Sequence, residues 1–453
     1  MLSQVSPSTS SDACSPLSVS VTGNNFTSAS QVTWNGSTLA TTFVSATQMT
    51  ATIPVADLSA SGIENVGVTT AGAANDSAAL PFTISNSQTS PDAVSFQINP
   101  AHSGYANMGC AIALPNTPTW TARLAGAPSY ALIADGKVFV TAQGSNAAFL
   151  YALDQQTGAV VWGPIEVSAS SAAYDNGQIF VGPSGFNNSA LVSAYSAANG
   201  SLNWSAVLPG QYSFSSGVTA ANGFVYTGGA GDGGTIYALS ESSGALAWTA
   251  YVANGDDSTP AVTATGVYVA YPCFTYALDP ANGGDIWVNS TGCDGGGGGT
   301  PIVANGVLYS PSGNGGYSGT TFNPSTGKVL GSYSADVLPS FDASNGYFLQ
   351  GGTLRGVSLT NNTVMWRFAG DGTLTTSPIT VSSYTFIGSS SGNLYAVDNA
   401  SGKLAWTYNI GSPFSRGASW NSGVPLTGLS AGAGMLVVPG GNALIAFRLA
   451  QVN

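Results

Sequence analysis

Charged residues are scarce in this chain of 453 residues. Lysine and arginine together number 8 and aspartate and glutamate 20, so 6% of the residues are charged, against about 25% in ordinary soluble domains. The net charge of -12 disfavours nucleic acids and anionic membrane surfaces as partners. A chain rich in glycine, serine, threonine and asparagine but poor in lysine suggests a secreted or cell-surface protein of bacterial type.

Long apolar runs are absent too. No stretch approaches the roughly 18 apolar residues that a spanning helix requires, so we expect no transmembrane segment. The first residues, MLSQVSPSTSS, lack the basic and apolar regions of a signal peptide.

The shortage of histidine and glutamate limits catalysis. His102 is the only histidine, so a Ser-His-Asp triad or a histidine-based zinc site would have to be built on one residue. We expect His102 to form a hydrogen bond at the junction between domains. Glycoside hydrolysis needs two facing carboxyl groups, and aspartates would have to supply them. We therefore predict a non-catalytic protein and leave a carbohydrate-active enzyme as a disfavoured alternative.

What the chain does contain is a repeat. Seven twelve-residue segments align without a gap, at spacings of 35 to 44 residues, and each reads as strand, tight turn and strand. One such segment for each four-stranded blade is typical of a β-propeller. The segments are YALDQQTGAVVW at Tyr151, SAYSAANGSLNW at Ser193, YALSESSGALAW at Tyr237, YALDPANGGDIW at Tyr276, TTFNPSTGKVLG at Thr320, RGVSLTNNTVMW at Arg355 and YAVDNASGKLAW at Tyr395.

Two positions of the segment are nearly constant. The turn holds glycine in six segments and Asn362 in the sixth in order, as a backbone with positive φ requires. The last position is tryptophan in six segments, and its flat ring suits packing between neighbouring blades. Gly331 replaces tryptophan in the fifth segment, so we expect this blade to pack less tightly.

The inner strands number eight, one more than the segments. Their turns begin near Asp135, Asn176, Asn222, Thr265, Asn305, Asn345, Ser383 and Ala433. The eighth unit ends at ALIAFRLA without a tryptophan strand, and a strand around Trp120 precedes the first unit. Pairing these ends would close the ring and remove the exposed sheet edges. We predict an all-β, eight-bladed propeller over residues 117–453.

Residues 1–88 follow another pattern. Short alternating strands separated by turns of glycine, asparagine and serine indicate a small immunoglobulin-like β-sandwich. The stretch 89–116, rich in serine, asparagine and proline, is predicted to be a linker.

Both parts resemble known families. The AxD-xx-TG-xxx-W pattern is similar to the PQQ-like, or quinoprotein-type, repeats of bacterial quinoprotein dehydrogenases and of an outer-membrane assembly lipoprotein. LSVSVTGNNF, VTWNGSTLATTFVSATQMTATIPVADL and ALPFTIS resemble the IPT/TIG family of extracellular sandwiches. The first resemblance implies a propeller with or without a quinone, and the second implies a domain that spaces or connects.

A quinone dehydrogenase is disfavoured by the residues. Such enzymes carry a vicinal cysteine pair, and no two cysteines here are adjacent. PQQ bears three carboxylates that need basic partners, for which only Arg355, Arg367 and Arg416 are candidates. We predict no cofactor.

The four cysteines fit two disulfides in the propeller model. Cys273 and Cys293 fall in loops on one face of the fourth blade, and a bridge between them closes about 20 residues, worth roughly 3 kcal/mol. Cys14 and Cys110 would then join the sandwich to the linker. The alternative is four buried thiols.

Acidic residues cluster in loops expected on that same face. Asp256, Asp257, Asp294 and Asp371 could contribute oxygen ligands to Ca²⁺, with Asp232 and Asp336 nearby, although no calcium-loop spacing is present. The alternative is solvated turn aspartates.

Two interaction functions remain. In one, copies of the chain associate into a layer or fibre, which the weak charge favours. In the other, the protein binds a surface glycan or protein through aromatic side chains such as Tyr212, Tyr317 and Trp420.

Overall fold

The computed structural model resolves two compact units. The first consists of residues 1–90, 108–113 and 450–453, and the second of 91–107 and 114–449. Residues 91–107, placed in the linker by the sequence, therefore belong to the second unit. The structure describes residues 2–10, 16–58, 62–71, 77–84, 91–168, 171–183, 185–186, 190–210, 213–214, 216–231, 233–253, 258–271, 273–291, 298–312, 317–416 and 426–451.

The first unit is a β-sandwich. One sheet has the order β1-β3-β7-β6 and the other β2-β9-β8-β4-β5, and inward residues such as Val19, Val21, Met49 and Phe82 are fully buried. This alternation of buried and exposed side chains is what packs two sheets face to face. The elements are β1 (Leu2–Ser6), β2 (Thr9–Ser10), β3 (Leu17–Gly23), β4 (Ser30–Trp34), β5 (Ser37–Thr38), β6 (Ala40–Ser45), β7 (Gln48–Ile53), a 3-10 turn η1 (Val55–Leu58), β8 (Gly62–Thr70) and β9 (Leu80–Ile84), with β11 (Ile112–Ala113) paired to β47 (Ala450–Gln451).

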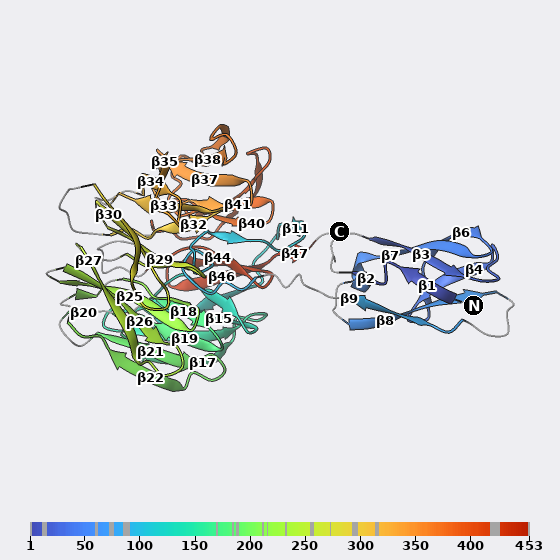
Figure 1. The fold of residues 1–453 in the computed structure, drawn as a ribbon, viewed down its shortest axis with the longest axis horizontal. Coiled ribbons are helices and arrows are strands. Elements are labelled where there is room, and N and C mark those ends of the chain that lie inside the picture. The colour runs from blue at the N-terminus through green and yellow to red at the C-terminus, as the bar shows by residue number, and fades with distance from the viewer. Residues whose placement is uncertain are drawn as a thin grey trace. The chain divides into compact units, whose positions relative to one another are not determined.

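The second unit consists, in its described residues, of eight sheets of four or more strands (Figure 1). The first four, from the inner to the outer strand, are β14 (Leu132–Ala134), β15 (Lys137–Gln143), β16 (Ala148–Asp154) and β17 (Val160–Val167), with β13 (Ala127–Pro128); β18 (Ala172–Asp175), β19 (Gln178–Val181), β21 (Leu191–Ser196) and β22 (Leu202–Val207); β24 (Thr219–Ala221), β25 (Phe224–Gly231), β26 (Gly233–Ser240) and β27 (Leu246–Val252), with β20 (Gly185–Phe186) and β23 (Ser213–Phe214); and β28 (Ala261–Thr263), β29 (Gly266–Tyr271), β30 (Phe274–Leu278) and β31 (Asp285–Ser290).

The other four sheets follow the same order. They are β32 (Ile302–Ala304), β33 (Val307–Pro311), β34 (Gly319–Phe322) and β35 (Val329–Tyr333); β36 (Ser340–Phe341), β37 (Asn345–Gln350), β38 (Thr353–Ser358) and β39 (Val364–Phe368); β40 (Ile379–Val381), β41 (Tyr384–Gly388), β42 (Asn393–Asp398) and β43 (Leu404–Asn409), with β10 (Tyr105–Ala106); and β44 (Ser430–Gly432), β45 (Met435–Gly440), β46 (Ala443–Arg448) and β12 (Trp120–Arg123).

The two ends of the repeat region share one sheet. β12 pairs antiparallel with β46, with Trp120 opposite Ala446 and Arg123 opposite Ala443. The inner strand β14 contacts β44 on one side and β18 on the other, and contacts continue from β18 through β24 and β28 to β32, and from β36 through β40 to β44. β12, the strand around Trp120, is thus the outermost strand of the sheet that also contains β44, β45 and β46.

Tryptophan side chains join neighbouring sheets. In six cases the indole Nε1 donates a hydrogen bond of 2.7–3.1 Å to a backbone carbonyl of the next sheet. We call each pair a tryptophan clasp. The pairs are Trp120 with Gln155, Trp162 with Ala197, Trp204 with Glu241, Trp248 with Pro280, Trp287 with Pro324 and Trp366 with Asn399.

Each clasp explains the glycine of its turn. Gly200, for example, has φ of +74° and lies so close to Trp162 that a Cβ atom would come within 2.7 Å of the ring. The same holds for the turn glycines opposite Trp120, Trp204, Trp248, Trp287 and Trp366. Two separate constraints therefore require glycine at this turn position. The backbone is left-handed, and the indole ring leaves no space for a Cβ atom.

We predict that Gly200→Ala destabilises the protein more than Gly177→Ala. Both glycines lie in the same sheet with φ of +74°, but a Cβ at Gly177 would meet nothing within 4 Å. The backbone cost of about 1–2 kcal/mol is common to both, and crowding against Trp162 adds about 1–3 kcal/mol. Urea unfolding of the two variants measures the difference, and equal stabilities would show that the indole does not press on the turn.

Candidate functional site

Residues 91–106, which we call the axial belt, run around the inside of the ring. Backbone hydrogen bonds of 2.7–3.1 Å join the belt to β14, β18, β28, β32, β36 and β40 and to Ala433, which follows β44. β10, at the end of the belt, also pairs parallel with β40. The inner strands thus find partners for their exposed edges within the chain itself. The belt carbonyls that accept are those of Pro91, Ala93, Val94, Pro100, Ala101, Ser103 and Gly104, and the Ala93 N–H also donates to the Ile133 carbonyl.

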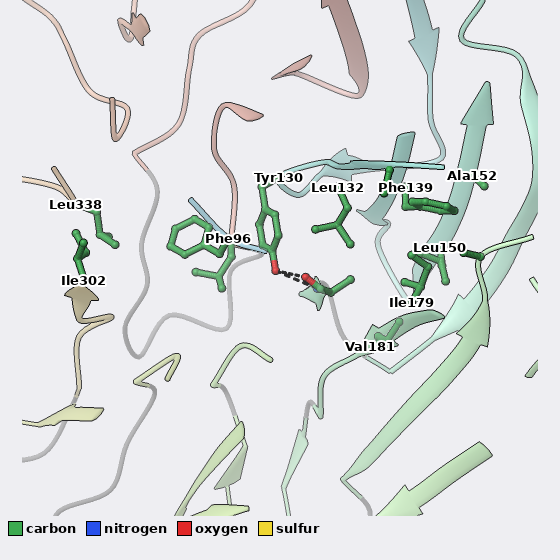
Figure 2. Close-up of a cluster of buried hydrophobic side chains, with 14 of the residues drawn as sticks. Phe96, Tyr130, Leu132, Phe139, Leu150, Ala152, Ile179, Val181, Ile302 and Leu338 are labelled. Atoms are coloured by element: carbon green, nitrogen blue, oxygen red, sulfur yellow. Dashed lines mark hydrogen bonds between the residues drawn. The ribbon is translucent and has the colours of Figure 1, made fainter. Parts of the chain in front are cut away.

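The interior beside the belt is filled by its own side chains. Phe96 is 2% exposed and belongs to a single apolar cluster with Tyr130, Leu132, Ile302 and Leu338. Figure 2 shows Phe96 with Tyr130 and Leu132 to one side and Ile302 and Leu338 to the other. The Tyr130 hydroxyl donates a 2.5 Å hydrogen bond to the Ala172 carbonyl, which links the first two sheets. Sheets from opposite parts of the ring therefore meet through one belt residue.

His102 lies in the belt and is fully buried. Its ring connects the belt to Pro301 and to Thr219 on β24. Its Nδ1 donates to the Pro301 carbonyl at 3.1 Å, and its Nε2 lies 3.4 Å from Thr219 Oγ1 on β24. Burial lowers the pKa of His102 to about 4, so the ring is neutral at pH 7. The histidine is a structural contact of the propeller, which differs from the predicted place at an interdomain junction.

A cavity of about 520 Å³ lies beside the belt. Its walls carry amides, a hydroxyl, a phenol and a carboxylate, namely Asn99, Ser103, Tyr105, Asn222, Asn305 and Asp342. The amides also tie adjacent sheets, because Asn222 donates to the Thr263 carbonyl (2.9 Å) and Asn305 to the Asp342 carbonyl (2.7 Å). The cavity is thus a mainly apolar recess with a few polar groups, two of which also hold adjacent sheets together.

Of the predicted calcium ligands, only Asp371 lies in the described part of the chain. Its carboxylate accepts hydrogen bonds of 2.8–3.0 Å from Asn393, Ser389 and Thr373. Although burial raises the pKa of Asp371, these bonds lower it well below the ordinary value. Asp371 thus fixes its own loop. Asp232, Asp256, Asp257 and Asp294 lie outside the described residues, within which no group of three metal-binding side chains is found.

The other predicted residues are placed as follows. Asp336 accepts a backbone hydrogen bond from Gly352 and offers its carbonyl to Arg416. Tyr317 is 3% exposed, so it does not present an aromatic surface. Tyr212 and Trp420 lie outside the described residues. No described cysteine is free, but Cys14 and Cys293, the predicted partners of Cys110 and Cys273, also lie outside, so both disulfides stay predictions.

A buried carboxyl group at Glu241 was not predicted from the sequence. This side chain is 4% exposed, and its Oε2 accepts a 3.0 Å hydrogen bond from Asn176. Burial, with a smaller contribution from the neighbouring Asp175, raises the pKa of Glu241 to about 7 against the opposing effect of the hydrogen bond from Asn176. The same turn position is glutamine, alanine, proline, leucine or asparagine in the other segments, so no pattern marks it as a place for a buried carboxyl group.

We predict that acidification destabilises the protein through His102. The unfolded histidine binds a proton near pH 6.5 and the folded one only near pH 4, so stability rises with pH across this window and is lost as pH falls through it. The loss is at most about 3 kcal/mol. His102→Asn, which tolerates the φ of 58°, should flatten this pH dependence in urea unfolding between pH 7 and 4.5. Parallel pH profiles for the two proteins would contradict the burial of a neutral ring.

Comparisons with known proteins match both units. Residues 101–208, 188–272 and 274–451 match the family model described as outer membrane protein assembly factor BamB, and residues 2–98 match the IPT/TIG domain. The predicted resemblances and the all-β propeller with an N-terminal sandwich are thereby confirmed. No curated protein matches the chain.

Solved structures show the same fold at low identity. BamB from Moraxella catarrhalis is 18% identical (TM-score 0.55; 73% of this chain and 99% of that one). A europium-containing methanol dehydrogenase is 12% identical (TM-score 0.57; 79% and 98%). The quinohemoprotein alcohol dehydrogenase from Comamonas testosteroni is 15% identical (TM-score 0.55; 80% and 81%). Binding modules and enzymes share this fold, so the residues must decide between them.

Proposed function

Because the chain belongs to the family of propeller-repeat proteins described as outer membrane protein assembly factor BamB, we propose that it is a non-catalytic protein-interaction scaffold. Its place is the bacterial cell envelope or surface, and its partners are further copies of itself. The family and the IPT/TIG domain support an envelope or surface location. Within the described residues, no helix has the length and hydropathy needed to cross a membrane.

The observation that carries this proposal is the outer rim of the propeller. The outermost strands β17, β22, β27, β31, β35, β39 and β43 all expose large apolar side chains, 38–71% accessible. These strands contain no lysine, and their charged residues are Glu166, Asp285 and Arg367. The apolar residues are Val160, Val161, Leu202, Val207, Leu246, Tyr251, Ile286, Val288, Val329, Leu330, Val364, Met365 and Leu404.

Such strands favour association. An edge strand presents unpaired backbone N–H and C=O groups, and soluble proteins usually protect it with lysine, proline or a covering loop. Here the edges are apolar and nearly uncharged, so strands of two copies can pair and bury their side chains together. A contact of this kind between different surfaces repeats without closing, which supports a layer or fibre.

The enzyme alternative finds no support in the basic residues. Arg367 is exposed on β39, and Arg416 is exposed and donates to the Asp336 carbonyl. Arg355 lines a separate cavity between two sheets. Arg355 and Arg367 are register partners on adjacent strands, but Arg367 is exposed and Arg416 is bonded to the Asp336 carbonyl. These residues therefore do not form the enclosed set of three cations that a tricarboxylate quinone would need, and this donor set does not fit PQQ.

We predict that the purified protein forms multimers whose mass, in light scattering, rises with concentration. Combining Val161→Lys, Leu202→Lys and Leu246→Lys should reduce the multimers to monomers, because charge on the rim opposes edge pairing. The control carries the same added charge at exposed hairpin turns, as Ala198→Lys, Ser242→Lys and Ala281→Lys, and should assemble like the wild type. A wild type that stays monomeric at every concentration would refute self-association.

A glycan- or protein-binding module is the second candidate, favoured by the cavity beside the axial belt, whose mainly apolar walls carry several polar side chains. Amides, a carboxylate and a tyrosine are the groups that hold sugar hydroxyls in place. Binding on a glycan array that is lost on Asn305→Ala would support this function over self-association.

A further inference from the structure

Two of the eight junctions between neighbouring sheets have no tryptophan clasp among the described residues. Trp406 still packs its ring edge-on against Phe447 at 5.5 Å, whereas at Gly331 the ring itself is absent and a cavity lies in its place. Position 331 on β35 is glycine, where six repeats have tryptophan. Between the sheets β32–β35 and β36–β39 there is a cavity of about 510 Å³ lined by Gly331. We call it the inter-blade cavity. Its volume falls in the range of roughly 300–1,000 Å³ that is typical of small-molecule sites.

The cavity is lined by residues at the repeat positions that surround the indole ring in a tryptophan clasp. We call this set of positions a tryptophan socket. Leu359 lines the cavity and occupies the repeat position of Gln155, Ala197 and Asn399, whose carbonyls accept from an indole. Asn362 also lines it, at the repeat position of the turn glycines that lie under an indole. A Cβ is tolerated at Asn362 because no indole from position 331 covers this turn.

Tyr333 does not replace the missing ring. It stands two residues after Gly331, and Phe368 and Tyr408 stand at the same distance after Trp366 and Trp406. Those two strands thus carry an aromatic residue at this place in addition to their tryptophan. Tyr333 forms part of the wall, where its ring lies edge-on to Tyr309 at 5.3 Å.

The walls combine aromatic surface with a single cation. Tyr309, Tyr333 and Phe348 form an aromatic wall, with ring centroids 5.3–6.3 Å apart. Arg355 stands at the repeat position that is tyrosine in four other segments, and it lines the cavity. Its Nε is buried and has no hydrogen-bond partner among the described residues.

The cavity carries a positive charge from Arg355, whereas the chain as a whole is negatively charged. No aspartate or glutamate is among its described lining residues, although the chain carries a net charge of -12. A buried guanidinium nitrogen without a partner favours a ligand that brings a carboxylate, which accepts charge-assisted hydrogen bonds.

We propose that the inter-blade cavity binds a planar aromatic carboxylate of the indole type. The ring takes the place of the absent tryptophan, its N–H donates to the Leu359 carbonyl, and the carboxylate pairs with Arg355. This chemistry is offered by a free indole carboxylate and by a peptide that ends in tryptophan. The site shares Leu330 and Val364 with the rim, but Val161, Leu202 and Leu246, the rim positions changed to lysine above, do not line it.

The test is calorimetric titration of the full-length protein with indole-3-acetate. We expect saturable binding that weakens at least tenfold for indole, which lacks the carboxylate, and for naphthalene-1-acetate, which lacks the N–H. A peptide ending in tryptophan, compared with its C-terminal amide, distinguishes the two sources. Binding of indole-3-acetate alone indicates a free metabolite, and binding of the peptide but not its amide indicates a chain terminus.

Variants place the ligand in the cavity. Arg355→Gln should weaken binding of indole-3-acetate at least tenfold, while Arg123→Gln, at an exposed position of another sheet, should leave it unchanged. Gly331→Trp with Asn362→Gly should abolish binding and raise the melting temperature, because a Cβ at Gly331 meets only Thr321 Oγ1 at 3.5 Å and the chain then fills its own socket. No binding by the wild type, or equal binding by wild type and Arg355→Gln, would overturn the proposal.

Discussion

The hydrogen bond from a tryptophan indole to a carbonyl of the next sheet is the interaction on which the propeller depends. It holds six of the outermost strands against the neighbouring hairpin, and its ring covers a glycine whose backbone no other residue adopts as readily. The clasp from Trp120 to Gln155 joins the sheet that contains both ends of the repeat region to the first sheet. Ring closure therefore uses the same contact as every other clasped junction.

Inside the ring, the axial belt holds the inner strands together through hydrogen bonds, as the tryptophan clasps hold the outer strands. It supplies backbone partners to strands that would otherwise expose their edges, and Phe96 and His102 fill the space between them. The rim, the interior and the inter-blade cavity all result from the way the sheets are joined, by clasps between outer strands and by the belt between inner strands. The rim is left unprotected, the interior is closed by the chain, and the cavity arises where one clasp is lost.

The features that could be predicted from the sequence are those that recur in every repeat. Regular spacing located the hairpins, the constant tryptophan and glycine indicated the contact between sheets, and the unpaired strand at Trp120 indicated closure. Gly331 was also visible as an exception. The axial belt was missed because INPAHSGYA has no periodicity and its bonds reach strands up to about 300 residues away. From the sequence, Arg355 was considered only as a ligand for a quinone. Its position beside a tryptophan socket could not be predicted, because it depends on how two neighbouring sheets pack together.

Native-state amide hydrogen exchange of Ser358 and Asp398 tests the role of the clasp most directly. Both amides close the same hairpin hydrogen bond at 2.9 Å, to Thr363 and to Lys403, but only the second hairpin is held by an indole, that of Trp366. Local opening is easier where fewer contacts must break. The account predicts faster exchange at Ser358, and equal protection of the two amides would contradict it.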